Sequence, residues 1–257
     1  MLLGLSINQY FFVSIFGILL LLSHFEFYRL IGTSGYRPNM LASTMLGMVL
    51  FVVSYLVASK NIDSDVFFTL PFFIVLFFVI ELYRDKKNTL KDTYTSLAAV
   101  VYIAVPFSML NFIIFDHAGN FSSWITIGIF LMIWGYDTFA FIGGVLIGKH
   151  KLMKRLSPKK TWEGLVIGGA FALLLSYFLT KYVGEISIEA WMGIALIIVS
   201  FGTLGDLFES KLKRTLHVKD SGKFLPGHGG LLDRFDTLLF VAPVVLAWLY
   251  IVEKFNI

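Results

Sequence analysis

Long apolar stretches are the feature of this sequence that most restricts its fold. A helix needs about 20 mostly apolar residues to cross the hydrocarbon core of a bilayer. Eight stretches meet this length, at residues 8–28, 41–59, 66–83, 96–115, 123–148, 163–180, 188–207 and 232–252. None alternates apolar and polar residues over about 10 positions, as a membrane β-strand does. The sequence therefore predicts an all-α, polytopic integral membrane protein with about eight transmembrane helices.

Composition supports a membrane protein. The 257 residues are 57% hydrophobic and 15% charged, whereas soluble domains average about 45–50% apolar and about 25% charged residues. No cysteine is present, which excludes thiolate catalysis and cysteine-ligated zinc. We expect one membrane-embedded domain over residues 1–257, with N-terminal helices in about 1–115 and catalytic helices and loops in about 123–252. The long, glycine-containing fifth stretch is expected to be tilted, kinked or broken. The first stretch is expected to be an anchor.

The charges between the apolar stretches predict the orientation of the chain. Lys and Arg concentrate in the short cytoplasmic loops of membrane proteins. The loops after the first, third, fifth and seventh stretches hold 18 of the 21 basic residues, whereas the other side keeps Lys60, Lys181 and Lys254. We therefore expect a protein of the cell membrane whose active site faces the cytoplasm and whose two ends are extracytoplasmic.

Four aspartates lie inside or at the ends of the apolar stretches. Asp137 lies deep in the fifth, Asp206 lies at the cytoplasmic end of the seventh, and Asp233 and Asp236 open the eighth. Charged side chains in spans are costly and usually functional, and the spacing of the last two places them on one helical face. The alternatives are helix capping for Asp233 and Asp236 and a structural partner for Asp137.

Basic and small residues accompany these acids. Residues 157–164 read SPKKTWEG, and residues 210–236 combine Lys, Arg, His and Gly with three aspartates. Carboxylates can hold Mg²⁺ on phosphate oxygens while cations neutralise the remaining charge. No Walker A or GxGxxG loop is present, so a nucleotide site here has another design. Four basic residues are instead expected to be topology signals or headgroup contacts: Lys149, Lys151, Lys154 and Arg155.

The segment from Ser210 to Asp236 resembles the signature of the phosphatidate cytidylyltransferases, also called CDP-diacylglycerol synthases. Its 27 residues carry the elements SKLKR, KD, LP, HGG and DRFD at the family's spacing. The SPKKTWEG segment and the segment around Asp137 resemble two further blocks, and HFEFY at residues 24–28 resembles a weaker acidic element. The resemblance covers residues 20–257. Members of the family usually have nine spans, whereas eight are expected here.

The resemblance implies a reaction in which CMP passes from CTP to phosphatidate, giving CDP-diacylglycerol and diphosphate. It implies Mg²⁺ as the cofactor, with a second cation left open. CTP and membrane phosphatidate are the implied partners, a homodimer is a further implication, and no nucleic acid is expected to bind. We expect Asp206 and Asp233 to be the principal metal ligands, and Asp137 and Asp236 to be further ligands or their partners.

The remaining predicted site residues contact the substrates or orient other side chains. Glu163 and Asp220 are expected to orient cations, and His228 is a phosphate donor, an acid or base, or a loop histidine bound to the backbone. The residues expected to bind substrate are Lys160, Thr161, Ser210, Lys213, Arg214, Lys219, Asp220, His228 and Arg234.

Three other functions are compatible with parts of this pattern. A secondary transporter also places carboxylates in its spans, but it does not need a long loop rich in Lys, His and Gly. A non-catalytic scaffold has little reason to keep all four acids. Within the enzymes, the alternative is a related CTP-dependent transferase acting on another membrane lipid, such as a polyprenol or an archaeal ether lipid.

Overall fold

Eight long apolar helices dominate the structure. The computed structural model describes residues 8–84, 89–218, 221–222 and 230–255. In this part of the chain eight helices are long and apolar enough to cross a membrane, which confirms the predicted class and the predicted number of spans. The helices divide between two compact units, Met1–Ser122 with Asp220–Arg234, and Ser123–Lys219 with Phe235–Ile257.

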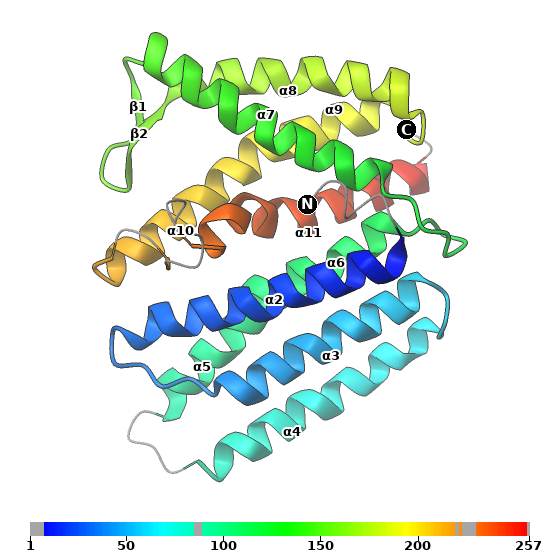
Figure 1. Ribbon diagram of the computed structural model, residues 1–257, viewed down its shortest axis with the longest axis vertical. Coiled ribbons are helices and arrows are strands. Elements are labelled where there is room, and N and C mark those ends of the chain that lie inside the picture. Colours follow the sequence, from blue (N-terminus) through cyan, green and yellow to red (C-terminus); the bar gives the residue numbers. More distant parts are fainter. Residues whose placement is uncertain (1–7, 85–88, 219–220, 223–229, 256–257) are drawn as a thin grey trace. The chain divides into compact units, whose positions relative to one another are not determined.

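The first unit contains the first four spans. Its elements are α2 (Gln9–Gly32), α3 (Met40–Ala58), a 3₁₀ turn (Ser64–Thr69), α4 (Leu70–Leu82), α5 (Thr89–Ala99), a π-helical turn (Val100–Ala104) and α6 (Val105–Ile114). Figure 1 shows α3 lying between α2 and α4. The side chains of Asn8 and Asn39 accept the N–H groups of Phe11 and Ala42, and such caps fix where α2 and α3 begin.

Aromatic side chains fill the core of the first unit. Phe16 of α2, Phe51 of α3 and Phe107 of α6 are almost completely buried. Among the polar contacts between these helices, the Asn111 side-chain amide of α6 donates to the Ser54 hydroxyl of α3 at 2.8 Å. In an apolar interior this hydrogen bond fixes the register of α6 on α3.

The second unit contains the other four spans and a small hairpin. Its elements are α7 (Trp124–Leu146), β1 (Lys151–Met153), β2 (Ser157–Thr161), α8 (Trp162–Val183), α9 (Ile188–Ile197), a π-helical turn (Ile198–Gly202), α10 (Thr203–Thr215) and α11 (Leu232–Phe255), whose first turn belongs to the first unit. β1 and β2 are antiparallel and pair Lys151 with Thr161. No pattern in the sequence predicted this hairpin.

Glycines let α7 and α8 pack closely side by side (Figure 1). Gly164 and Gly168 face backbone carbonyl oxygens of α7, and a Cβ atom on Gly168 would lie 2.7 Å from the Tyr136 oxygen. Small residues at this spacing let backbones approach. Gly148 serves the hairpin, since a Cβ atom there would lie 2.8 Å from the Thr161 hydroxyl.

The helix ends differ from the apolar stretches in two places. The fifth span is one continuous helix, α7, and is not broken. The seventh span was expected to end at residue 207, but its helix continues through α10 to Thr215. The added turns are polar and are stabilised by the ion pair between Glu209 and Lys213 at i,i+4 spacing and by Lys213 and Arg214 in the last turn.

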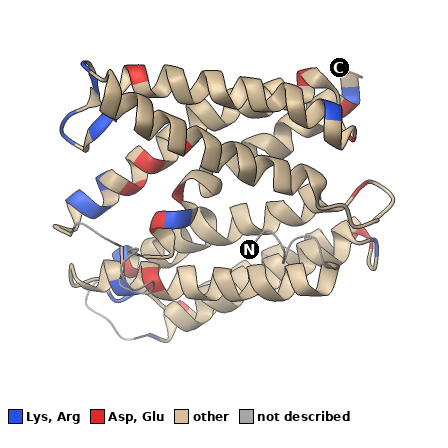
Figure 2. Ribbon diagram, turned by 45° about the horizontal axis from the view of Figure 1, so that its top comes forward, with Lys and Arg blue, Asp and Glu red and all other residues tan. Residues whose placement is uncertain are grey.

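Charge is distributed unevenly along the second unit. Figure 2 shows basic residues at the hairpin and at the C-terminal end of α10. Lys181 and Lys254 lie instead in the last turns of α8 and α11, at the other end of the unit. This division within one unit agrees with the loop charges from which the orientation was predicted. The side of the membrane that each end faces stays a prediction.

Candidate active site

Two glycines bring α10 and the adjoining π-helical turn against α11. A Cβ atom on Gly205 would lie 2.6 Å from the backbone oxygen of Asp236, and one on Gly202 would lie 2.9 Å from the Thr237 methyl carbon. Any larger residue would push the helices apart. The close approach is what allows Asp206, the residue after Gly205, to reach side chains of α11.

Asp206 is held by a partner at each carboxylate oxygen. The Thr237 hydroxyl of α11 donates to Oδ1 at 2.7 Å, and the Lys160 ammonium of β2 forms an ion pair with Oδ2. The Asp206 side chain is 16% exposed and the Lys160 side chain 30% exposed. Because both oxygens have partners and little water reaches them, the carboxylate has a fixed orientation.

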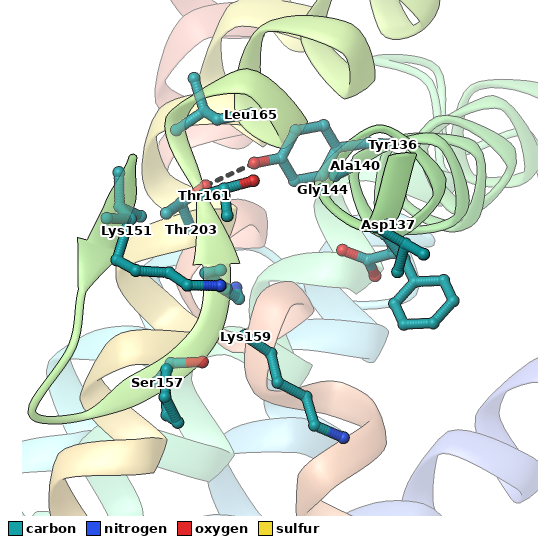
Figure 3. A pocket seen from close by; sticks show the side chains of 15 residues that line it. Tyr136, Asp137, Ala140, Gly144, Lys151, Ser157, Lys159, Thr161, Leu165 and Thr203 are labelled. Atoms are coloured by element: carbon teal, nitrogen blue, oxygen red, sulfur yellow. Dashed lines mark hydrogen bonds between the residues drawn. The ribbon is translucent and has the colours of Figure 1, made fainter. Parts of the chain in front are cut away.

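Asp137 lies on α7 at the wall of a cavity of about 630 Å³, a volume within the usual range for a ligand pocket. Figure 3 shows the Asp137 carboxyl group and the Lys151 amino group directed into the space between α7 and the hairpin. Asp137 is within electrostatic range of Asp206 and Lys160. Asp137, which lines the cavity, is therefore close to Asp206 of the seventh span.

The wall of this cavity carries more positive than negative charge. Lys151, Lys159 and Lys160 line it together with Asp137. Lys160 is paired with Asp206, whereas Lys151 and Lys159 add positive charge beside Asp137. Lys151 was expected to be a topology signal, so its place in this wall differs from the prediction. An excess of cations in a half-open cavity suits an anionic ligand.

Polar groups also hold the apolar side of the cavity in place. The hydroxyl groups of Tyr136 on α7 and Thr203 on α10 are hydrogen-bonded at 2.6 Å, as the dashed line in Figure 3 marks, and both residues line the cavity. Thr203 also donates to the Val199 carbonyl oxygen at 2.7 Å. This chain of hydrogen bonds joins α7 to α10 three residues before Asp206.

A second group of acids lies on α10 and α11. Glu209 is 1% exposed, accepts from the Lys213 ammonium at 2.9 Å and lies close to the Asp236 side chain. Asp236 is also within electrostatic range of Asp206. Acids this close repel one another unless cations offset their charge. Lys160 and Lys213 supply two such cations from the chain itself.

Asp233 and Arg234 lie in the first turn of α11, within the first unit. The Oδ2 oxygen of Asp233 accepts the backbone N–H groups of Gly230 at 3.0 Å and Ser221 at 3.2 Å. Both N–H groups belong to residues that precede α11. Arg234 is exposed. Asp233 therefore holds the start of its own helix in place.

Two predicted residues beside the hairpin have structural partners. Thr161 is 4% exposed and its hydroxyl accepts the Gly164 N–H at 3.2 Å, which caps α8. Glu163 accepts from the His150 backbone N–H at 3.1 Å and is hydrogen-bonded to the His150 Nδ1 atom at 2.6 Å. The expected role of Glu163 in orienting cations stays a prediction.

The remaining predicted residues fall on α10 or outside the described part of the chain. Ser210, Lys213 and Arg214 lie on α10, where the Arg214 guanidinium donates to the Val218 carbonyl oxygen at 3.3 Å. The predictions for three residues, namely Lys219, Asp220 and His228, lie outside the described residues.

Carboxylate oxygens are the donors that the described residues offer to a metal. Within the ranges that the structure describes, no group of three or more His, Cys, Asp or Glu side chains could hold a metal ion. Mg²⁺, however, is commonly bound by one or two carboxylates together with waters and substrate phosphates. Asp137 and Asp206 fit that pattern. The donor set therefore fits an Mg²⁺ ion.

Sequence reasoning missed two side chains of this region. Glu209 follows Asp206 by three residues, a spacing that places both on one helical face. Thr237 directly follows Asp236 in the sequence, but only the approach of α10 to α11 reveals that it bonds Asp206. The i,i+3 rule could have found Glu209, whereas no local signal identifies Thr237.

Comparisons with known proteins identify the family that this chain resembles. The sequence matches the family model described as "Cytidylyltransferase family" over residues 1–252. The phosphatidate cytidylyltransferase of Staphylococcus aureus (strain COL) is 38% identical over 175 residues, which make up 67% of this chain and 64% of that protein. This chain therefore matches less than two thirds of the length of that relative.

Two further relatives carry the same name. The phosphatidate cytidylyltransferase of Rickettsia bellii (strain RML369-C) is 32% identical over 216 residues, covering 81% of this chain and 90% of that protein. The one from Staphylococcus saprophyticus is 35% identical over 232 residues, covering 77% and 89%. Since the family match extends over nearly all of a chain with eight membrane helices and a cationic, carboxylate-bearing cavity, the chain belongs to the cytidylyltransferase family.

Proposed function

We propose that this protein transfers CMP from CTP to phosphatidate and releases CDP-diacylglycerol and diphosphate. The observation that carries the proposal is the cavity in which Asp137 lies with Lys151, Lys159 and Lys160 among membrane helices. Both substrates are polyanions, and their approach requires cations. Relatives at 32–38% identity that are named phosphatidate cytidylyltransferase support this choice of substrates.

The proposed reaction is a single displacement at phosphorus. A phosphate oxygen of phosphatidate attacks the α-phosphorus of CTP and forms a new P–O bond, while the bond from that phosphorus to the α,β-bridging oxygen breaks and diphosphate leaves. A phosphate monoester has a second pKa of about 6 and is mostly dianionic at pH 7. No side chain has to remove a proton from this nucleophile, so we assign no general base.

The chain's own residues supply positive charge and fixed geometry. Lys151 and Lys159 offset the charge of the phosphates in the cavity, and Lys160 does so while also holding Asp206. Thr237 and Lys160 together keep the Asp206 carboxylate in one orientation, and such preorganisation accounts for much of the catalysis in phosphoryl transfer.

We further propose Mg²⁺ as the cofactor, with Asp137 and Asp206 as its protein ligands and Asp236 as their neighbour. When bound, the ion would neutralise phosphate oxygens and polarise the α-phosphoryl group. A metal-ligand role for Asp233 stays a prediction. The proposed site faces the cytoplasm, because CTP is cytoplasmic and the basic loops are expected on that side.

The test uses CTP labelled at either of two positions and the purified protein in mixed micelles. With phosphatidate, Mg²⁺ and CTP carrying ³²P at the α-position, label should enter the lipid fraction. With CTP labelled at the γ-position, label should appear only in diphosphate. Transfer of γ-label to lipid would mean that the chain is a lipid kinase, and the proposed function would be wrong.

A panel of acceptors separates phosphatidate from the alternative lipids. Polyprenyl phosphate and an archaeal ether-linked phosphatidic acid should accept at least tenfold less label than diacyl phosphatidate. Asp206→Asn provides the matched inactive protein, because it keeps the shape of the side chain and removes its charge. Excess EDTA should abolish transfer and added Mg²⁺ should restore it. Transfer that persists in EDTA would refute the metal assignment.

A further inference from the structure

Helix α2 buries an acid that the reaction described above does not use. Glu26 is 5% exposed. Burying its carboxylate without hydrogen-bond partners would cost a large amount of free energy. Its partners come from residues about 200 positions later in the same unit. The Ser221 hydroxyl donates to Oε1, and the Leu231 N–H donates to Oε2 at 2.6 Å.

The groups that Glu26 accepts from include the N–H groups at the start of α11. The Leu232 N–H also points to Oε1, at 3.4 Å, and α11 begins at Leu232. The first N–H groups of a helix have no acceptor within it, and the positive end of the helix dipole favours a nearby carboxylate. Glu26 is therefore a cap for α11 that is supplied by another helix.

Two glycines leave room for this carboxylate. A Cβ atom on Gly222 would lie 2.9 Å from the Glu26 Cδ atom, and one on Gly230 would overlap the Glu26 Oε1 and Ser221 Oγ atoms. A side chain at either position would displace the acid or the backbone. Gly222 and Gly230 are thus required by the presence of Glu26, independently of any ligand.

Asp233 is hydrogen-bonded to the same two short segments as Glu26, Ser221–Gly222 and Gly230–Leu232. Its Oδ2 oxygen accepts the N–H groups of Ser221 and Gly230, the neighbours of the groups that Glu26 holds. Together the two acids accept backbone N–H groups from four residues. If the Glu26 carboxylate were lost, the first turn of α11 would lose the contacts that fix where Asp233 lies.

We propose that Glu26 is a positioning residue for Asp233: its buried carboxylate caps α11 and fixes the turn from which Asp233 projects. The proposal rests on the proposed function and on the predicted metal-ligand role of Asp233 in it. Glu26 itself does not touch substrate, because it is enclosed by Ser221, Gly222 and Gly230. A displacement of about 1 Å at a reacting group is enough to lower a rate by about 100-fold.

The first test is Glu26→Gln, which keeps the size of the side chain. One carboxylate oxygen becomes an NH₂ group, which cannot accept from the hydroxyl and N–H groups that face it. We expect kcat per folded molecule to fall by about 10- to 100-fold, the usual effect of removing a group that orients a ligand. Amide hydrogen exchange should become faster at Ser221–Gly222 and Gly230–Leu232. Unchanged exchange in these segments, or faster exchange with wild-type kcat, would overturn the proposal.

The matched control is Glu81→Gln in the same unit. Glu81 is a buried acid, 4% exposed, that accepts from Arg84 at 2.7 Å and Thr93 at 3.1 Å. This variant should lose thermal stability to a similar extent, whereas kcat and the exchange of Gly230–Leu232 should stay at wild-type values. An equal fall in kcat in both variants would show that replacing any buried acid in this unit lowers kcat, and the positioning role of Glu26 would be refuted.

A milder variant covers the case in which Glu26→Gln does not fold. Ser221→Ala removes one of the hydrogen bonds to Glu26, and we expect kcat to fall by about 2- to 10-fold, because the other donors to the carboxylate remain. Wild-type kcat in Ser221→Ala would then overturn the proposal. If the wild-type protein transferred no CMP, the proposed function would fail, but hydrogen exchange would still reveal whether Glu26 holds the start of α11.

Discussion

The hydrogen bond from Thr237 to Asp206 offers a sharp test of the proposed active site. Thr237→Val replaces the hydroxyl by a methyl group of nearly the same size. It retains the other methyl carbon, which packs closely against Gly202. The Asp206 carboxylate would keep Lys160 at Oδ2 but lose its donor at Oδ1. The substitution thus changes the orientation of one carboxylate and leaves the packing of α11 intact.

The expected size of the effect follows from burial and charge. A hydrogen bond to a charged group contributes about 1.5–3 kcal/mol. Thr237 is 4% exposed and the Asp206 side chain 16% exposed, so water cannot easily replace the lost donor. At about 1.4 kcal/mol per factor of ten, kcat should fall by about 10- to 100-fold. The lower end is expected, because Lys160 still restrains the carboxylate.

The assay is the transfer of α-labelled CMP to phosphatidate, with kcat and the KM for CTP measured at several Mg²⁺ concentrations. Thr237→Ser keeps the hydroxyl and should retain most of the activity. The matched control is Thr126→Val, because Thr126 is completely buried in the same unit and its hydroxyl has no hydrogen-bond partner among the described residues. This control should keep wild-type kcat and unchanged or higher thermal stability.

Two results would refute this reasoning. If Thr237→Val kept wild-type kcat at every Mg²⁺ concentration, the orientation of Asp206 would not matter for the reaction. If Thr237→Val and Thr126→Val lost activity equally, the effect would come from packing in general. In either case Asp206 could not be the oriented carboxylate that the proposed mechanism requires.

The remaining predictions concern charge, the cavity and topology. Asp206→Asn should lower kcat by at least about 100-fold, equivalent to a few kcal/mol of transition-state stabilisation, while the purified variant elutes as a folded protein. Lys151→Gln removes a cation from the cavity and should lower kcat/KM by about tenfold, as expected for the loss of one charge-assisted hydrogen bond. Lys154 is exposed and is not among the cavity-lining residues, so the kcat/KM of Lys154→Gln should stay within about twofold of the wild-type value in the same assay. Ser157→Cys in this cysteine-free chain should react with an impermeant maleimide only in inverted vesicles, and labelling of intact cells would reverse the predicted orientation.

The number of spans could be predicted because a membrane helix leaves a strong signal in length and hydropathy. The ends of a membrane helix leave a weaker signal in the sequence. The apolar part of the seventh span stops near residue 207, but the helix continues to Thr215 because helical hydrogen bonds and the pair between Glu209 and Lys213 do not depend on lipid. Because the span was taken to end with the apolar stretch, Glu209 was not recognised as a helical neighbour of Asp206.

The acids of the site could be predicted individually, but their partners could not. Asp137 and Asp206 stand out because charges are rare in apolar stretches. The ion pair between Lys160 and Asp206 joins residues 46 positions apart. It depends on a hairpin whose short strands, with a proline and three lysines, lack the alternation typical of strands. Lys151 reaches the cavity through the same hairpin, which is why sequence reasoning treated it as an orientation signal.

The π-helical turn Ile198–Gly202 has a consequence for how this chain is compared with its relatives. Such a turn holds one residue more than an α-helical turn, and turns of this kind occur often at functional sites. Deleting a single residue there, such as Ser200, would turn it into an α-helical turn, and Asp206 would keep the face that it presents to α11. Deleting a residue from the α-helical part of the span before this turn would instead rotate everything after it by about 100° and shift it by about 1.5 Å, and Asp206 would face away from α11. A one-residue gap in an alignment therefore has opposite meanings inside and outside this turn.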